Sequence, residues 1–471
     1  MTAVTRIPMR LRASGPRSGS RTLARGLRCG GTVSADIVGD DPDLRVAGRP
    51  RRCAVPTRRP MSAHPAGAVI WIVNQYAGSP RHGMEYRHYH FARALIERGH
   101  RVVVISGSRS HLFIRPPQVS RPFTLEPIDG VTYCWVAVPR YERAISLRRV
   151  LNMAAFALRL ERLPVQRLPR PDAILVSSPS LFPVPIAARW ARRFGARLVF
   201  EVCDIWPLTL RELGGLSRGH PLVMAMQWLE DYGYRKADSV VSVLPAATRH
   251  MVSRGMDPRK FHYIPNGIDL AGRRAGGRAP DVVRAAIRPG TFTVGFVGTL
   301  GRANALETLI DAARLLDPDE AQVILVGQGP EREQLVTRAA GAPNVAFTAA
   351  VLEEHVGPAI ALFDACYVGY RRSPLYRFGV SPNKLYEYMA AGRPVLFAAD
   401  AANQPVLEAD CGRTVAPEDP AALAAAIRSL AARSQEERDR LGANARAYVA
   451  RHHDYARLAE ELADILMGDE R

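Results

Sequence analysis

Short runs of aliphatic residues alternate with longer helical stretches from residue 68 to residue 467. The short runs are nearly continuous in Val, Ile and Leu, which is typical of strands buried on both faces of a parallel sheet. In the first half of the chain, strands are expected at 68–73, 101–106, 131–138, 172–177, 197–202, 239–244 and 262–265, and helices at 86–98, 183–194, 221–236 and 246–254.

The alternation is interrupted at 269–290, where Gly, Ala, Arg and Pro dominate as they do in linkers. A second series of strands and helices then follows, and its closing segment, 435–467, is strongly helical. Strands are expected at 293–298, 322–327, 345–348, 365–369, 395–399 and 414–416, and helices at 305–316, 331–340, 356–363, 383–391 and 420–432.

Two such series predict an α/β fold with two Rossmann-like doubly wound domains facing a cleft. The length of 471 residues also favours two domains. Ligands of these sheets bind outside the carboxyl ends of the strands. We expect an N-terminal domain at 61–268, a linker at 269–290, a C-terminal domain at 291–450 and a C-terminal helix at 451–471.

The formal net charge of +19 is unevenly distributed along the chain. Residues 1–60 hold 13 Arg and 4 Asp in a stretch rich in Gly, Pro and Ser. This stretch is expected to be a disordered Arg-rich tail or the result of a mis-called start, with Met61 as the alternative start. The remaining, moderate positive charge suits anionic nucleotides or lipid headgroups. Basic patches interleaved with aromatic residues are not evident, so nucleic acid is not an expected partner.

Cysteine spacing and hydropathy narrow the class of protein further. The six cysteines lie far apart and form no C-x-x-C pair, so neither a zinc site nor a disulfide framework is indicated. A reducing cytosol is therefore the expected compartment. No run of 18 apolar residues occurs, so no membrane-spanning helix is predicted.

A glycine turn, Gly298-Thr299-Leu300-Gly301, follows a predicted strand and precedes a predicted helix. Its backbone amides are expected to face an anion at that helix start, beside Arg302 and Asn304. The alternative is a tight connection without a ligand. The turn does not match the Walker A pattern, and no G-x-G-x-x-G opens the first strand. A P-loop kinase and a standard NAD enzyme are therefore disfavoured.

Lys384 is one of only three lysines among 64 Lys and Arg residues, and it lies in the first turn of a predicted helix. A lysine in so arginine-rich a chain suggests a need for a compact, flexible point charge. Phosphate oxygens beside a helix start are one such case. Glu387 lies three residues on, so the pair offers a cation for phosphates and a carboxylate for ribose hydroxyls. The alternatives are a chance surface lysine and an intrahelical Lys–Glu contact.

Several segments, in this order along the chain, closely resemble GT-B glycosyltransferases of the GT4 kind, in particular the bacterial polysaccharide and O-antigen group. The resemblance spans about residues 68–467. The matching segments include Gly83-Met-Glu-Tyr-Arg87, Asp204-Ile-Trp-Pro207, Pro265-Asn-Gly-Ile-Asp269, Val326-Gly-Gln-Gly-Pro-Glu-Arg332 and Ser381-Pro-Asn-Lys-Leu-Tyr-Glu-Tyr-Met-Ala-Ala-Gly-Arg-Pro-Val395. The most specific are Pro265-Asn-Gly-Ile-Asp269 and the run Met389-Ala-Ala-Gly-Arg-Pro394.

The resemblance implies a nucleotide-sugar donor in the second domain, an acceptor in the first, and retention of configuration without a metal or another cofactor. It places Glu387 on the donor ribose. Many relatives carry a second glutamate eight residues earlier, where this chain has Gly379. Ser381, Asn383 or backbone amides are therefore expected to supply contacts to the sugar, unless the donor differs.

The resemblance also assigns roles to charged residues elsewhere. Relatives often place a lysine where this chain has Arg302-Ala-Asn-Ala-Leu-Glu307. Arg302 is expected to substitute for it in part, and Lys384 becomes the better candidate for the diphosphate. Arg87 is expected to be an active-site cation, with a helix-surface arginine as the alternative. Asp204 is expected to orient the acceptor hydroxyl or accept its proton, and a cap of the following turn is its alternative. Independently of the resemblance, His82, His88, His90 and His100 cluster in the sequence, and a metal site is the alternative for His88 and His90. Because residues at i and i+2 do not share a helix face, the four are expected to be surface and packing residues.

The expected function is a metal-independent hexosyl or acetamidohexosyl transfer from a sugar nucleotide, UDP-linked by default, to a lipid-linked or saccharide acceptor. The Arg-rich segment 143–162 is expected either to contact an anionic membrane or to pack on the first domain. The expected location is the cytoplasm, with possible peripheral contact to the inner face of the cytoplasmic membrane. A sugar-nucleotide epimerase and a non-catalytic sugar-nucleotide binder are the alternatives.

Overall fold

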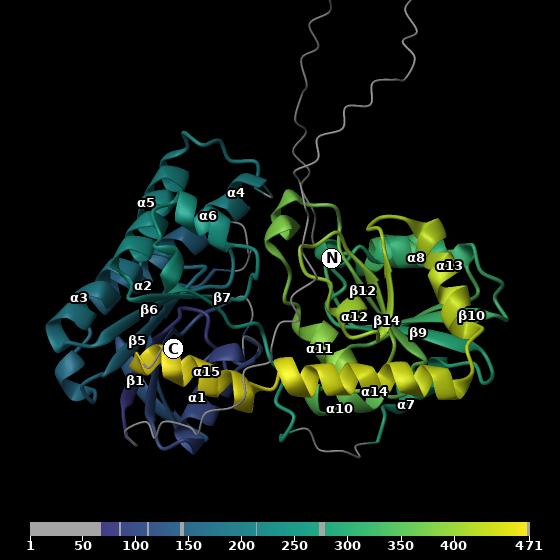
Figure 1. The fold of residues 1–471 in the computed structure, drawn as a ribbon, viewed down its shortest axis with the longest axis horizontal. Helices are drawn as coiled ribbons and strands as arrows, with labels where there is room; N and C mark the ends of the chain where they lie inside the picture. Colours follow the sequence, from purple (N-terminus) through teal and green to yellow (C-terminus); the bar gives the residue numbers. More distant parts are fainter. Residues whose placement is uncertain are drawn as a thin grey trace, which may run out of the picture. The chain divides into compact units, whose positions relative to one another are not determined.

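The structure is a computed structural model that describes residues 67–83, 86–110, 113–141, 146–212, 214–272 and 278–468. The described chain forms two α/β domains, each with a central sheet covered by helices on both faces (Figure 1). This confirms the predicted fold class. The expected tail at 1–60 lies outside the described residues.

The first sheet is parallel except at one edge, with strand order β3-β4-β2-β1-β5-β6-β7-β8. The edge strand β3 pairs antiparallel with β4 and was not predicted, because its sequence contains Glu126 and Pro127 and is half exposed. Proline and charge are typical of edge strands. The strands are β1 (Val69–Val73), β2 (Arg101–Gly107), β3 (Phe123–Ile128), β4 (Val131–Val136), β5 (Ala173–Ser177), β6 (Arg197–Val202), β7 (Ser239–Ser242) and β8 (Phe261–Tyr263).

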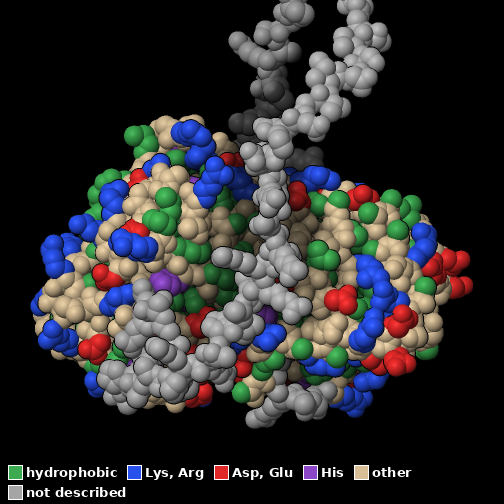
Figure 2. All heavy atoms as spheres, viewed as in Figure 1, with side chains coloured by type: hydrophobic (Ala, Val, Ile, Leu, Met, Phe, Trp, Pro, Cys, Tyr) green, Lys and Arg blue, Asp and Glu red, His purple; other side chains and the backbone are tan. Residues whose placement is uncertain are grey.

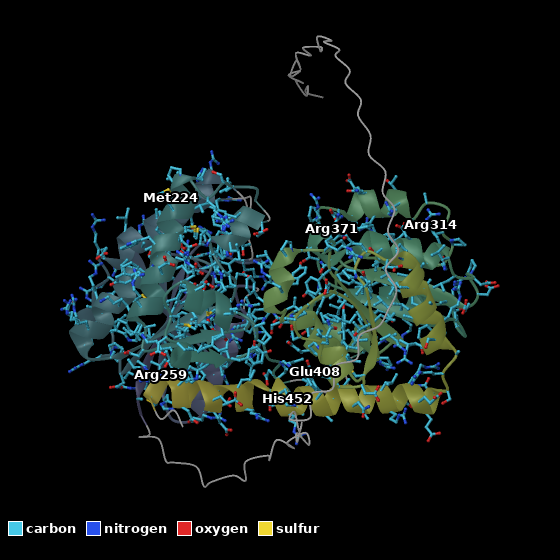
Figure 3. All side chains as sticks on the ribbon, turned by 45° about the horizontal axis from the view of Figure 1, so that its top comes forward. Met224, Arg259, Arg314, Arg371, Glu408 and His452 are labelled. Atoms are coloured by element: carbon cyan, nitrogen blue, oxygen red, sulfur yellow. The ribbon has the colours of Figure 1, made fainter. Side chains whose placement is uncertain are left out.

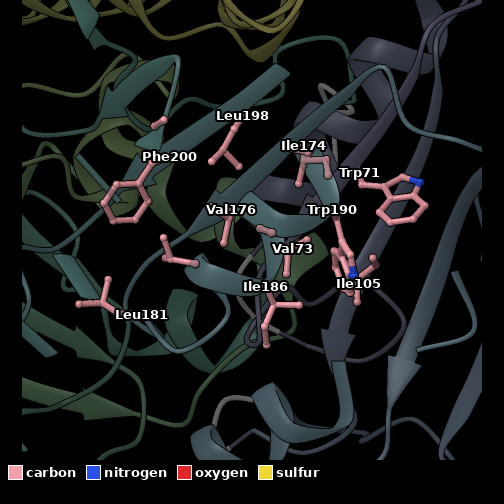
Figure 4. Close-up of a cluster of buried hydrophobic side chains, with 14 of the residues drawn as sticks. Trp71, Val73, Ile105, Ile174, Val176, Leu181, Ile186, Trp190, Leu198 and Phe200 are labelled. Atoms are coloured by element: carbon pink, nitrogen blue, oxygen red, sulfur yellow. The ribbon is translucent and has the colours of Figure 1, made fainter. Parts of the chain in front are cut away.

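Aromatic and aliphatic side chains fill the space between this sheet and its helices (Figure 4). Trp71 of β1 meets Trp190 of α3 edge to face, with ring centroids 5.6 Å apart. Such packing fixes the strands whose ends carry the polar residues described below. The helices are α1 (Arg87–Glu97), α2 (Leu147–Leu160), α3 (Val184–Phe194), α4 (Leu208–Glu212), α5 (Pro221–Lys236) and α6 (Thr248–Ser253), with short 3-10 turns at Val165–Arg167 and Pro258–Lys260.

The second sheet is wholly parallel, with strand order β11-β10-β9-β12-β13-β14. This is the strand order of dinucleotide-binding sheets. The chain adds β10 and β11 on one side of β9 and then crosses over to add β12, β13 and β14 on the other side. All six strands lie where the hydrophobic runs predict them. They are β9 (Phe292–Val297), β10 (Ala321–Val326), β11 (Val345–Thr348), β12 (Ala365–Gly369), β13 (Val395–Ala398) and β14 (Gly412–Val415).

Helices of the second domain include one inside the predicted linker. Residues 281–286 form α7, which packs against β10 and β11, so this part of 269–290 belongs to the second domain. The others are α8 (Leu306–Arg314), α9 (Arg332–Arg338), α10 (Glu353–Ile360), α11 (Asn383–Ala390), α12 (Pro405–Glu408), α13 (Pro420–Ala431) and α14 (Gln435–His452), with 3-10 turns at Arg302–Asn304 and Pro374–Phe378.

The closing helical segment divides into α14 and α15 (Tyr455–Met467) and returns to the first domain (Figure 1). The break occurs at Asp454, whose side chain accepts a hydrogen bond from Ala456 N and so starts a new helix. Leu458 and Leu462 of α15 are buried against the first sheet. The chain passes between the domains twice, once near Ile268 and once near His453. Ile268 N donates to His453 O at 2.7 Å, so these two connecting segments are hydrogen-bonded to each other.

Candidate functional site

A cavity of about 490 Å³ lies between the carboxyl ends of the first sheet's strands and the segment that precedes α11. Asn74 follows β1, Ser178 follows β5 and Asp204 follows β6, so the reversal point of the first sheet opens into this cavity. Gly379 and Asn383 line it from the second domain. Both domains therefore contribute to one site.

A buried ion pair between Arg87 and Glu201 supports the wall of this cavity. Arg87 Nε donates to Glu201 Oε1 at 2.9 Å, and Glu201 has no exposed surface. Burial alone would raise the pKa of Glu201, but the charge of Arg87 and the contacts with His88 and Ser177 outweigh it and lower the pKa. The Glu201 carboxylate is therefore ionised, and these partners compensate the cost of burying its charge.

Arg87 also reaches the segment that crosses between the domains. Its terminal nitrogens donate to Pro265 O at 2.6 Å, to Ile264 O at 2.9 Å and to Asn266 Oδ1 at 3.1 Å. Arg87 thus lines the cavity, but these hydrogen bonds go to protein groups. It links α1 to β6 and to the segment 264–266.

Asn266 extends this connection to the start of α11. Asn266 N donates to Ser381 Oγ at 2.8 Å, and Asn266 Nδ2 donates to Ser381 O at 2.6 Å. Ser381 Oγ lies 3.3 Å from Tyr386 OH, and the Tyr386 ring stacks on His453 with centroids 3.7 Å apart. The two sequence motifs that contain Asn266 and Ser381 are therefore parts of one connected structure.

His88 and Glu201 are site residues that the sequence prediction missed. His88 is 2% exposed, as a packing residue would be, but it also lines the cavity and places Nε2 2.6 Å from Glu201 Oε2. Ser177 Oγ donates to the same carboxylate oxygen at 2.6 Å. One signal was present in the sequence: Glu201 is a carboxylate within an otherwise apolar run that predicts a buried strand.

Asp204 lies in the loop after β6, and Ser178 holds that loop. Ser178 Oγ accepts from Cys203 N at 2.9 Å and from Asp204 N at 3.3 Å. The Asp204 side chain is exposed to the cavity, yet the closely surrounding protein atoms desolvate it. This desolvation raises the pKa of Asp204, and nearby Arg149 opposes the rise only in part.

Arg149 reaches the cavity from the first turn of α2, inside the segment expected either to contact a membrane or to pack on the first domain. Its Nε donates to Tyr76 OH at 3.1 Å. The guanidinium lies 5.1 Å from the Tyr76 ring centroid and 5.6 Å from that of Trp206. These contacts orient a cation on the same wall as Asp204.

Lys384 is not among the residues that line this cavity; it follows the lining residue Asn383 and lies where β9 and α11 meet. Its Nζ donates to Asn304 Oδ1 and lies 4.9 Å from the Phe296 ring centroid. Burial lowers the pKa of Lys384 to about 8, with Glu387 opposing the shift. The structure therefore places the lysine, Asn304 and the helix carboxylate in one cluster.

Backbone amides of the glycine turn after β9 have partners within the protein. The amides of Gly298, Leu300 and Gly301 already donate to the carbonyls of Val326, Gln328 and Thr299. These three amides are thus committed to the turn, which favours the alternative of a tight connection, and the expected anion contact stays a prediction. Thr299 O also accepts from Asn304 Nδ2 at 2.8 Å, which holds Asn304 under the Lys384 ammonium.

Glycines in the turn after β10 allow that turn to pack closely against the glycine turn after β9. A Cβ atom on Gly327 would lie 1.9 Å from Gly298 O, and one on Gly329 would lie 2.2 Å from Leu300 O. Any larger residue would separate the two turns. Their role in the described structure is the contact between neighbouring loops.

Arg302 occupies the 3-10 turn that leads to α8 and is exposed. Its carbonyl accepts from Arg371 Nε at 3.0 Å, and Arg371 pairs with Glu307 at 2.6 Å. The Arg302 side chain is thus exposed, two residues before Asn304, while Arg371 fixes the backbone of its turn.

Gly379, at the position of the missing glutamate, has a backbone conformation that only glycine adopts easily, with φ +101°. A Cβ there would lie 2.5 Å from Pro245 Cδ, in the first domain. Phe378 O, one residue before, accepts from Ala246 N at 3.0 Å. In this arrangement a close contact between the domains replaces the carboxylate.

Sequence profiles of two protein families match the chain. One, described as "Glycosyl transferase 4-like domain", matches residues 82–267, and the other, "Glycosyl transferases group 1", matches residues 291–433. Together they cover more than half of the chain and correspond to its two domains.

Two curated relatives have similar sequences. WcaI of Escherichia coli, named as a candidate colanic acid biosynthesis glycosyl transferase, is 24% identical over 276 residues, which cover 57% of this chain and 67% of WcaI. A GDP-mannose-dependent alpha-(1-6)-phosphatidylinositol dimannoside mannosyltransferase of Mycobacterium tuberculosis is 27% identical over 263 residues, covering 51% of this chain and 67% of its own.

Solved structures share the fold at low sequence identity. Sucrose-phosphate synthase of Thermosynechococcus elongatus has a TM-score of 0.64 and 18% identity, covering 84% of this chain and 98% of its own. HepE of Anabaena, solved in complex with UDP-glucose, has a TM-score of 0.58 and 16% identity, covering 85% and 99%. These likenesses concern the fold alone.

Proposed function

The chain belongs to the GT-B glycosyltransferases of the GT4 kind, and we propose that it moves a sugar from a nucleoside diphosphate sugar to a hydroxyl of a lipid-linked or saccharide acceptor, with retention of configuration. The observation that carries this proposal is the single cavity lined by the strand ends of the first domain and by the Gly379–Asn383 segment of the second. Such a site brings two substrates together in one place.

We assign the donor to the second domain. Lys384 and Arg302 supply positive charge for the diphosphate, and Glu387 accepts hydrogen bonds from the ribose hydroxyls. Ser381 and Asn383 lie closer to the cavity, where the sugar would be held. Cations aimed at the departing diphosphate stabilise the charge that develops in the transition state.

We assign the acceptor to the first domain. Asp204 faces the cavity, and the raised pKa of its carboxyl makes it a stronger base than an ordinary aspartate. It would orient the acceptor hydroxyl, while the leaving diphosphate takes the proton on the same face. Arg87 would act by holding the crossing segment and the start of α11 together.

UDP is the first donor nucleotide to test. HepE was solved with UDP-glucose and the mycobacterial relative is named for GDP-mannose, so GDP is the second. Cell-surface polysaccharide synthesis is the context suggested by the name of WcaI.

Contact with the inner face of the cytoplasmic membrane is part of the proposal. No helix within the described ranges is long and apolar enough to cross a membrane. Leu151 and Leu158 of α2 are exposed, as are Met224 (Figure 3) and Trp228 of α5. On the face shown in Figure 2, basic and acidic side chains are interspersed over both domains. The apolar side chains on α2 and α5 are therefore the proposed contact.

The test is a turnover screen with UDP-, GDP- and ADP-sugars, with products followed by NMR. The proposal predicts nucleoside diphosphate release that depends on an added acceptor, with the donor's anomeric configuration kept in the product. Conversion of the sugar nucleotide without an acceptor would indicate an epimerase, and binding without any turnover would indicate a non-catalytic binder.

A further inference from the structure

The two walls of the cavity differ in charge. Its charged lining residues, such as Arg87 and Asp204, come from the first domain. Among the described residues, the second domain adds no charged side chain to this lining, but it adds two partly exposed tyrosines, Tyr370 and Tyr376. Their rings meet edge to face, with centroids 4.8 Å apart. The second domain therefore presents an aromatic surface to the cavity.

The turn Pro374–Phe378 directs its side chains to two sides. In a 3-10 turn, residues at i and i+3 lie one above the other. Leu375 and Phe378 are spaced in this way, and both pack on the hydrophobic core of the first domain. Tyr376 packs instead on the core of the second domain, beside Tyr370. The spacing therefore leaves the Tyr376 ring free of the first-domain core, where it can line the cavity.

Both tyrosines stand on backbone that is held by hydrogen bonds. Tyr370 N donates to Ala398 O at 2.9 Å. Tyr376 O accepts from Gly379 N at 2.9 Å and from Ala402 N at 3.0 Å. Burial raises the pKa of both phenols, so each ring is neutral near pH 7. Neutral rings on a fixed backbone lose little freedom when a ligand packs against them.

The tyrosine pair lies between the groups assigned to the donor and to the acceptor. Tyr370 directly follows β12, which neighbours β9 where the order of the second sheet reverses, and ligands bind outside such a point. The turn that carries Tyr376 packs against α4, the helix that begins shortly after Asp204. After burial, the charge of Asp204 is the second cause of the raised pKa of Tyr376. A sugar that joins a diphosphate near Lys384 to a hydroxyl near Asp204 would therefore lie along the two rings.

We propose that the transferred sugar packs a C–H face against Tyr370 and Tyr376, which makes these two residues determinants of donor-sugar recognition. Sugar rings carry apolar C–H faces, and aromatic rings bind such faces by burying apolar surface. The aromatic ring, and neither charge nor the phenol hydroxyl, is the part that this role requires. The inference deepens the proposed function and rests on it, because it presumes a sugar nucleotide whose diphosphate lies near Lys384.

The experiment compares a sugar nucleotide with its own nucleoside diphosphate by calorimetry, without an acceptor. The probes are UDP-glucose, UDP-galactose and UDP-N-acetylglucosamine with UDP, and GDP-mannose with GDP. The sugar nucleotide that wild-type protein binds most tightly is used for the variants. The measured quantity is its Kd divided by the Kd of the nucleotide, since this ratio separates the contribution of the sugar from that of the diphosphate.

The variants remove or keep each ring. Tyr370→Leu and Tyr376→Leu should each raise the ratio about three- to tenfold and leave the Kd of the nucleotide unchanged. Tyr370→Phe and Tyr376→Phe keep the ring and should keep the wild-type ratio. Tyr232→Leu is the matched control, because Tyr232 belongs to a ring pair with Trp228 on α5, with centroids 5.5 Å apart, and does not line the cavity. It should leave the ratio unchanged.

A ratio that stays at the wild-type value in both leucine variants would overturn the inference. So would an equal rise in the phenylalanine variants, because the hydroxyl would then bind the sugar, or equal weakening of nucleotide and sugar nucleotide, because the rings would then only support the fold. Tyr376→Leu lies on a partly exposed turn and decides the test if Tyr370→Leu does not fold. Failure of wild-type protein to bind any of these nucleotides would instead overturn the proposed donor site, so the two failures are distinguishable.

Discussion

At the residue scale, Arg87 and Lys384 were both predicted to be active-site cations, but their surroundings differ. Arg87 is buried in an ion pair with Glu201 and cross-links the chain. Lys384 meets a neutral amide, Asn304, and an aromatic face. Burial lowers the pKa of Lys384, and the Glu387 carboxylate offsets this shift only in part. A bound diphosphate would supply further counter-charge.

The lowered pKa of Lys384 should make nucleotide binding depend on pH. The pKa of Lys384 is about 8, below its usual value, so the ammonium is mostly charged at pH 7 and is lost as pH rises through 8. Diphosphate favours the charged form, so the Kd for UDP or GDP should rise by up to about tenfold per pH unit above 8. The terminal phosphate completes its own ionisation below this range.

Calorimetric titrations between pH 7 and 9.5 measure this dependence. In Lys384→Arg the cation does not titrate in this range, so any remaining affinity should be flat. A wild-type Kd that is constant from pH 7 to 9.5 would show that Lys384 does not bind the diphosphate.

At the element scale, the turn from Pro374–Phe378 into α11 is built for close approach between the domains. Gly379 combines a φ of +101° with a potential Cβ only 2.5 Å from Pro245. The absence of the family's glutamate is therefore linked to backbone packing as well as to chemistry. Restoring the carboxylate should not restore a family-like site.

We expect Gly379→Glu and Gly379→Ala to lower the free energy of unfolding more than Gly341→Ala does. Gly341 also has positive φ, +78°, but a Cβ there meets nothing within 4 Å, so that variant carries only the backbone cost of about 1 kcal/mol. Urea denaturation measures all three. Equal losses at the two glycines, or a gain of activity in Gly379→Glu, would refute the packing explanation.

Elements of the fold were predictable because buried parallel strands have a strong local pattern. Edge strand β3 was not, since Glu126 and Pro127 break that pattern. A separate C-terminal helix was expected from 451, and α15 begins at Tyr455 after the Asp454 cap. The contact of Ile268 with His453 beside this break was not predictable, because the two residues lie far apart in the sequence. In the site, Lys384 was identifiable by composition. Its contact with Asn304, 80 positions away in the sequence, was not.

At the scale of the whole molecule, the last helix makes the first domain depend on the end of the chain. α15 packs on α1 and the first sheet, and Leu462 is fully buried there. All five tryptophans precede residue 229, so tryptophan fluorescence reports on the first domain alone. A substitution in α15 should therefore be visible in that signal.

We expect Leu462→Ala to lower the stability of the first domain by about 2–5 kcal/mol, through lost burial and a cavity. Leu158→Ala, which truncates a leucine of α2 that is 63% exposed, should change it by less than about 0.5 kcal/mol. The measurement is urea unfolding followed by tryptophan fluorescence. An unchanged midpoint in Leu462→Ala would mean that α15 contributes nothing to the first domain.

The central claim is that a nucleoside diphosphate binds at the cluster of Lys384 and Asn304, and its most direct test is calorimetric titration of UDP, GDP and ADP. Wild-type protein, Lys384→Ala, Lys384→Arg and Lys260→Ala are compared. Lys260 is the matched control because it bonds carbonyls of the first domain, at 2.6 Å from Ala237 O. We predict that one nucleotide binds wild type and Lys260→Ala equally, and binds Lys384→Ala at least about tenfold more weakly. Lys384→Arg should not recover wild-type affinity. Equal affinity in Lys384→Ala and wild type, or no nucleotide binding to either, would contradict the claim.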